Sequence, residues 1–66
     1  MDREETVRNV QSEMESLVRL HKQGLYYTRG YQARKREIER CIREYQIDLM
    51  KEIDPVSVVL YRRYCE

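Results

Sequence analysis

The sequence lacks tryptophan and phenylalanine, has a single proline and two glycines, and contains only two cysteines among its 66 residues. Two cysteines cannot build the disulfide framework of a small secreted domain, and without a secretory signal they predict reduced thiols inside the cell. We therefore expect an intracellular protein, cytoplasmic or nuclear, that is not secreted. No apolar run approaches the roughly 18 residues that a transmembrane helix needs, so no membrane span is expected.

Signatures of catalysis and of ligand binding are also missing. The chain has one histidine, His21, and neither a Cys-x-x-Cys pair nor a cluster of residue types that bind metals. General acid–base chemistry needs a pocket that shifts carboxylate pKa values, and helices this thin predict none. We expect no enzymatic activity, no metal, no cofactor and no small-molecule substrate. Cys41 fits the edge of an apolar helix face as a small hydrophobic residue.

Charged residues are abundant instead, at 38% of the chain. Together with the shortage of glycine and proline, this composition is typical of long exposed helices. A chain of this length buries only about 60% of its unfolded surface and is marginally stable alone. The sequence therefore predicts a single all-α domain over residues 1–66 that gains stability from self-association or from a partner.

Apolar residues recur every three or four positions along most of the chain, a period typical of helices that bury a seam against other helices. The pattern is interrupted in the middle, where the seam would hold His21, Gly24, Thr28 and Lys35. Two interpretations stay open there. One continuous helix crosses the interruption, or the chain folds back through a turn over about residues 24–30. The poor packing of these four residues favours the turn.

Capping residues divide the chain into three predicted helices. Asp2 is a suitable N-cap for a first helix over about residues 2–23, and Thr28 can cap a second helix over about residues 31–53. Asp54 and Pro55 then give the sharpest signal, because Asp is favoured at the N-cap and Pro at the first helical position. A short third helix is expected over about residues 55–64.

These helices predict an antiparallel, coiled-coil-like hairpin with a short C-terminal helix, assembled into a dimeric bundle with a second copy or a helical protein partner. In the third helix, Val59, Leu60 and Tyr64 are predicted to dock the tail, either back onto the hairpin or into a groove of another chain. The predicted association seam consists of Val7, Val10, Met14, Leu17, Ile38, Ile42, Tyr45, Leu49 and Ile53.

We interpret the chain as a non-enzymatic protein–protein interaction module. The alternative is a small dimeric nucleic-acid-binding regulator, because residues 21–43 carry seven basic and two acidic groups, a net charge of +5. An exposed row of arginines on the second helix would contact phosphates, with Tyr26 and Tyr27 nearby for stacking. The same row is also compatible with a solvated face of ion pairs at i,i+4 spacing. The row consists of Arg29, Arg36, Arg40 and Arg43.

Overall fold

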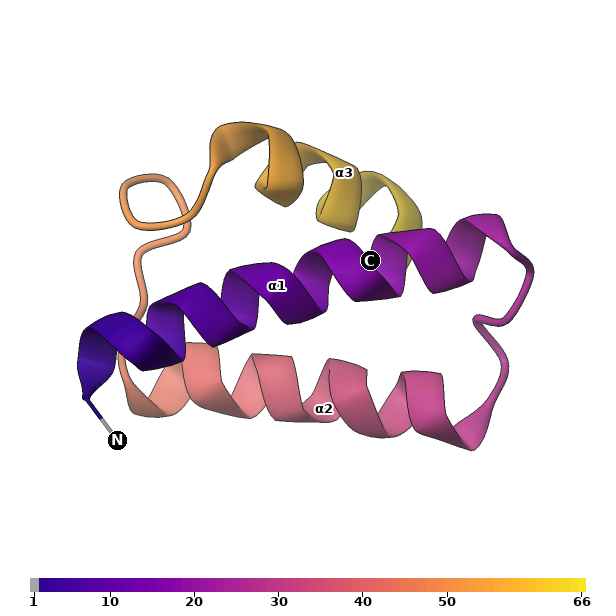
Figure 1. Cartoon of the computed structure of the whole chain (residues 1–66), viewed down its shortest axis with the longest axis horizontal. Helices are drawn as coiled ribbons and strands as arrows, with labels where there is room; N and C mark the ends of the chain where they lie inside the picture. The colour runs from indigo at the N-terminus through magenta and orange to yellow at the C-terminus, as the bar shows by residue number, and fades with distance from the viewer. Residues whose placement is uncertain (1) are drawn as a thin grey trace.

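The computed structural model describes residues 2–66, and all regular structure within that range is helical. The helices are α1 (Arg3–Lys22), α2 (Arg29–Glu44) and α3 (Pro55–Cys65). Figure 1 shows α2 running antiparallel along one side of α1, and α3 lying along another side of α1. α1 packs against both other helices and is the central element of the fold.

Each helix begins where the sequence predicts a cap. The side chains of Asp2, Thr28 and Asp54 accept hydrogen bonds from backbone N–H groups two or three residues further on. Such bonds satisfy donors that have no partner within the helix. Pro55 occupies the first turn of α3, as predicted. The local start signals in this chain are therefore sufficient to place all three N-termini within about two residues.

The first turn is built around Gly24. This residue adopts φ +80°, in the left-handed region that favours glycine. The N–H groups of Gly24 and Leu25 donate to the carbonyls of His21 and Leu20, at 3.0 and 2.9 Å. This is the Schellman arrangement that closes many helices. Because α1 ends here, one continuous helix across the interruption is not formed, while Gly30 lies within the first turn of α2.

The second helix is shorter than predicted. It ends at Glu44, and residues 45–54 form a non-helical loop instead of continuing the helix to about Ile53. Gln46 takes the left-handed conformation at φ +51°, and the N–H of Ile47 donates to the carbonyl of Ile42. Ile47 and Ile53 are both buried, at 5% and 3% exposure. Six residues apart on a helix they would point about 120° away from each other, so the loop allows both to reach the core.

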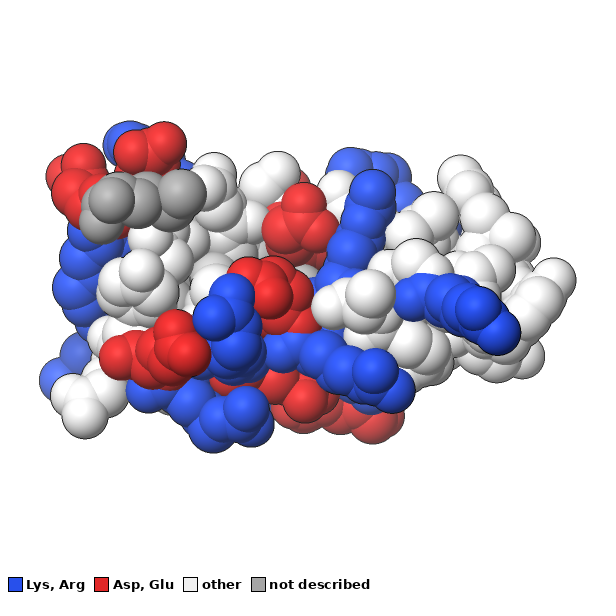
Figure 2. Space-filling model, turned by 90° about the horizontal axis from the view of Figure 1, so that it is seen from below, with Lys and Arg blue, Asp and Glu red and all other residues white. Residues whose placement is uncertain are grey.

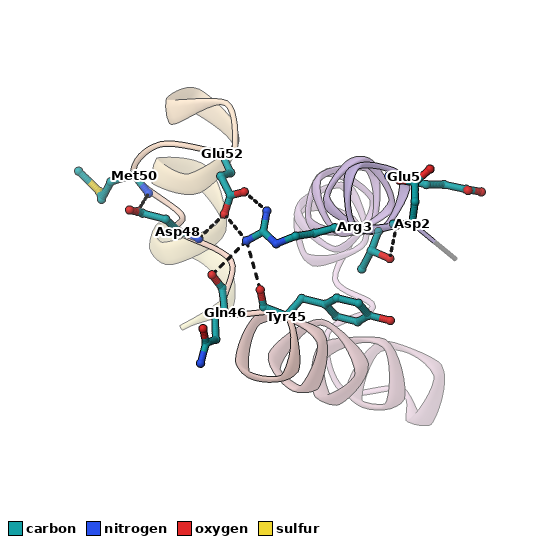
Figure 3. A network of polar contacts seen from close by, with 9 residues as sticks. Asp2, Arg3, Glu5, Tyr45, Gln46, Asp48, Met50 and Glu52 are labelled. Carbon is teal, nitrogen blue, oxygen red and sulfur yellow. Dashed lines mark hydrogen bonds and ion pairs between the residues drawn. The ribbon is translucent and has the colours of Figure 1, made fainter.

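The loop over residues 45–54 is held against the start of α1 by polar contacts (Figure 3). The guanidinium of Arg3 donates to the carboxylate of Glu52 and to the carbonyl oxygens of Tyr45 and Gln46, both at 3.2 Å. Glu52 also accepts from the backbone N–H of Asp48 at 2.7 Å. These bonds, led by the one from Arg3, lower the pKa of Glu52 to about 2. These bonds fix residues 45–54, which have no regular secondary structure, to the start of α1.

Most of the predicted association seam packs inside this one chain. Ile42, Leu49 and Val7 are partly buried against the core, and Tyr45 is 37% exposed at the end of α2. The remaining seam residues are each at most 3% exposed: Val10, Met14, Leu17, Ile38 and Ile53. The seam is therefore occupied by contacts within the chain.

The helix α3 docks through a different face from the predicted one. Its buried residues are Ser57, Val58, Tyr61 and Cys65, whereas Val59 is 63% exposed. Of the three predicted docking residues, Val59 therefore points away from the core, whereas Leu60 and Tyr64 are partly buried against it. The buried hydroxyl of Ser57 donates to Glu15 of α1 at 3.0 Å, which removes the cost of burying an unpaired polar group.

Candidate functional site

An exposed apolar surface lies on the outside of α3. Val56 and Val59 are 65% and 63% exposed, and with Pro55 and Leu60 they line a shallow hollow that has no polar residue in its wall. We call these four residues the α3 outer face. Two of the predicted tail-docking residues, Val59 and Leu60, belong to it. Exposed β-branched residues grouped in this way are typical of a surface that a partner covers.

The charges next to the α3 outer face are segregated along the helix. Asp54 precedes the helix as its N-cap, and Arg62 and Arg63 lie in its last turn. No acidic residue occurs between Pro55 and Cys65. The outer face is thus apolar along its length, with a negative charge at one end and two positive charges at the other.

The predicted arginine row lies exposed on α2, but it is interleaved with carboxylates. The guanidinium of Arg40 pairs with Glu37 and with Glu44, and the hydrogen bond to Glu37 is the main cause of a raised pKa of Arg40. Figure 2, which looks onto the α2 side of the molecule, shows blue and red side chains intermixed over its middle. A strip of this kind does not present four unpaired positive charges. The i,i+4 pair predicted for Arg40 and Glu44 is present, at 3.5 Å.

A second feature lies at the opposite end of the molecule from the loop over residues 45–54. The rings of His21 and Tyr26 stack at a centroid distance of 4.6 Å, and Tyr64 of α3 lies 5.6 Å from His21. Tyr31 of α2 completes the group, with its hydroxyl 3.5 Å from Nδ1 of His21. Tyr27 packs edge-on against Tyr26. We call these five residues the aromatic end.

The sequence interpretation missed the aromatic end as a group. His21 is half-buried near the turn, and nothing along the chain connects it with Tyr64. The contact exists because α3 runs along α1 in the same direction, as Figure 1 shows, and brings Tyr64 to the last turn of α1. Tyr64, predicted as a docking residue of the tail, therefore packs within the chain. The orientation of α3 against α1 brings the residues of the aromatic end together, and the sequence does not reveal that orientation.

A groove of about 290 Å³ runs between α1 and α2. Its apolar wall includes Val10, Ile38 and the half-buried Cys41, and carboxylates of Glu13 and Glu37 lie among its lining residues. Burial, and next the negative charge of Glu37, raise the pKa of the Cys41 thiol. A raised pKa keeps the sulfur protonated at neutral pH, so Cys41 is a poor nucleophile.

Within residues 2–66, no three side chains of the types that bind metals come together as a metal site requires. No helix in that range is both long enough and apolar enough to cross a membrane. Comparison with protein-family models, with curated proteins and with solved structures finds no match to this chain. The two exposed surfaces, the α3 outer face and the aromatic end, are therefore the candidate functional sites.

Proposed function

We propose that the chain is a non-enzymatic protein–protein interaction module that self-associates through the α3 outer face. The observation that carries the proposal is the exposure of Val56 and Val59, above 60% each, beside Leu60 on a helix whose other face is fully packed. Removing such side chains from water contributes about 25 cal/mol for each Å² of apolar area. The groups that the sequence assigned to the seam are already used within the chain, so association needs this separate surface.

A second copy is the occupant that the surface fits best. Two copies of α3 related by a two-fold axis bring the same apolar residues together, because such an interface uses one patch twice. In an antiparallel pair, Arg62 of one copy approaches Asp54 of the other. A chain of 66 residues is also in the size range where association commonly supplies missing stability. Apolar contact and charge thus favour the same arrangement.

Sedimentation velocity of the purified chain, from low micromolar to submillimolar concentration, tests the proposal. We expect a concentration-dependent dimer. Val59→Glu places a charge in the centre of the interface and should leave a monomer with unchanged helical circular dichroism, since Val59 is exposed in the single chain. Met50→Glu is the matched control: Met50 is 74% exposed but lies in the loop before α3, so this variant should still dimerise.

Three results would contradict the proposal. One is a chain that stays monomeric over the whole concentration range. Another is a dimer that persists in Val59→Glu, which would place the contact elsewhere. The third is a dimer lost equally in both variants, because a general effect of added negative charge would then explain the loss.

A further inference from the structure

The aromatic end combines open rings with positive charge that the rest of the molecule does not neutralise. Tyr26 and Tyr27 are 49% and 74% exposed, in a turn that joins α1 to α2. The ammonium of Lys22 lies 5.3 Å from the centroid of the Tyr64 ring, and the guanidinium of Arg63 lies 6.0 Å from it. Rings and cations therefore alternate over one small surface.

The cations at this end are available for a ligand. Within residues 2–66 the arginines in ion pairs are Arg3, Arg34 and Arg40, and neither Lys22 nor Arg29 takes part in one. The sequence from residue 16 to residue 36 contains six Lys or Arg and no Asp or Glu. In Figure 2 the red side chains occupy the left and the middle of the view, while the right end, where this turn lies, shows blue and white.

The ring arrangement leaves room for a further stacked group. One face of Tyr26 is covered by His21, with an interplanar angle of 25°. Tyr27 contacts Tyr26 at an interplanar angle of 89°, and with 74% of Tyr27 exposed most of its ring surface lies in solvent. The carbonyl of Tyr26 accepts a hydrogen bond from the amide of Gln32 at 3.1 Å, which fixes the turn to α2. The rings are thus presented on a turn whose backbone is held in place.

Exposed tyrosines flanked by unpaired cations match the chemistry of unpaired bases joined by phosphates. A base stacks on an aromatic ring whatever its sequence, and cations along the same surface contact the backbone. A duplex keeps its bases stacked internally and offers only its phosphates to such a surface. An acidic peptide would use the cations but would gain little from an open ring face.

We propose that the aromatic end binds single-stranded nucleic acid, with Tyr27 stacking on a base and Lys22, Arg29 and Arg63 contacting phosphates. Of the arginine row that the sequence suggested, only Arg29 belongs to this surface. Three phosphate contacts predict that the logarithm of the binding constant falls with the logarithm of salt concentration with a slope of about −2. The site is small, so binding to a few nucleotides without sequence preference is expected.

Fluorescence anisotropy with a dye-labelled oligothymidylate, titrated with the full chain at several NaCl concentrations, tests this assignment. Tyr27→Leu should weaken binding about tenfold, the order of effect of one lost stacking contact. Lys22→Gln combined with Arg29→Gln should bring the salt slope from about −2 to about −0.7, since each cation contributes about 0.7. Both sets of residues are exposed, and circular dichroism should show the wild-type helix content.

The matched control is Arg36→Gln combined with Arg43→Gln, which removes the same charge from α2 at a distance from the exposed rings. It should change the salt slope little. Equal effects of the two double variants would overturn the proposal, as would unchanged affinity in Tyr27→Leu or no binding at the lowest salt. A duplex of the same length, or polyglutamate, that competes as well as the single strand would also overturn it. The residues tested lie outside the α3 outer face, so a failure at one surface does not decide the other.

Discussion

The two ends of this molecule use charge in opposite ways. At the end formed by the start of α1 and the loop over residues 45–54, Arg3 binds the Glu52 carboxylate and two backbone carbonyls of the same chain. At the aromatic end, Lys22 and Arg29 have no carboxylate partner within the described chain. The cation at the first end stabilises the fold, whereas the cations at the second end remain able to interact with solvent or with a ligand. The absence of a carboxylate partner for Lys22 and Arg29 is what distinguishes the aromatic end as a candidate binding surface.

The strongest test of this contrast removes a ring from the aromatic end. Tyr31 is 3% exposed, and burial is the main cause of its raised pKa. Tyr31→Ala should lower the free energy of unfolding by about 3–5 kcal/mol, as for other large-to-small changes at buried aromatic positions. Tyr27→Ala is the control, since its ring is 74% exposed and should contribute little to stability. Chemical denaturation followed by circular dichroism measures both variants.

Equal losses in the two variants would show that the aromatic end does not divide into a packed part and a free part. If Tyr31→Ala is unfolded even without denaturant, Tyr31→Leu keeps an apolar group at the site and makes the comparison measurable. The order of stability should then be Tyr27→Ala above Tyr31→Leu.

A smaller change in the free energy of unfolding is expected from substitutions at the C-terminal ends of α1 and α2. Gly24 and Gln46 occupy the same left-handed position after α1 and after α2, and no atom lies within 4 Å of a Cβ added to Gly24. Only backbone strain then penalises Gly24→Ala, and we expect a loss of about 1 kcal/mol. Gln46→Gly relieves the same strain and should gain a few tenths to about 1 kcal/mol, offset in part by a more flexible unfolded chain.

Denaturation midpoints of these two variants should therefore move in opposite directions. Gly30→Ala gives the internal control, because Gly30 has a helical conformation inside α2 and open space around it. It should stabilise the fold through helix propensity. Destabilisation by Gln46→Gly would contradict the equivalence of the two helix ends.

The smallest effect is expected for the contact between Arg3 and Glu52, which is exposed to solvent and screened. The folded-state pKa of Glu52, about 2, lies below its ordinary value of 4.5. The carboxylate therefore stabilises the fold above about pH 4.5, and this contribution is lost as the pH falls toward 2. Glu52→Gln should lower the urea midpoint slightly at pH 7, and its difference from wild type should shrink on acidification.

Glu4→Gln is the matched control for this titration. Glu4 lies next to Arg3 in the chain but forms none of the ion pairs found within residues 2–66. A difference between Glu52→Gln and wild type that grows as the pH falls from 4.5 to 2 would contradict the role assigned to Glu52. A response of Glu4→Gln equal to that of Glu52→Gln would do the same.

The sequence predicted helix starts better than helix ends, and the reason is local. Asp2, Thr28 and Asp54 act on backbone groups within three residues, so the chain itself carries the information. The end of α1 could also be predicted from Gly24, since glycine commonly follows the last residue of a helix. The end of α2 was not, because Gln46 takes a conformation that glycine normally supplies. The burial of Ile47 and Ile53 and the hydrogen bond from Arg3 to the Gln46 carbonyl, all set by the tertiary structure, offset that strain.

For the candidate surfaces too, local sequence patterns predicted some features and only the tertiary structure decided others. The apolar period identified Val10, Met14, Leu17 and Ile38 as buried, because one helix face must leave water wherever the helix packs. The period did not reveal that these residues pack within one chain. Nor did it reveal which face of α3 turns inward, since that helix has apolar residues on more than one side.

By itself, the sequence determined that this protein is helical, where its helices begin and that Val10, Met14, Leu17 and Ile38 are buried, since caps and periodicity act over a few residues. The tertiary structure decided that α2 stops at Glu44, that α3 buries Val58 and leaves Val59 exposed, and that His21 meets Tyr64. Those outcomes depend on how helices far apart in the sequence share one small core. The open surfaces that remain after that packing are the ones available for binding.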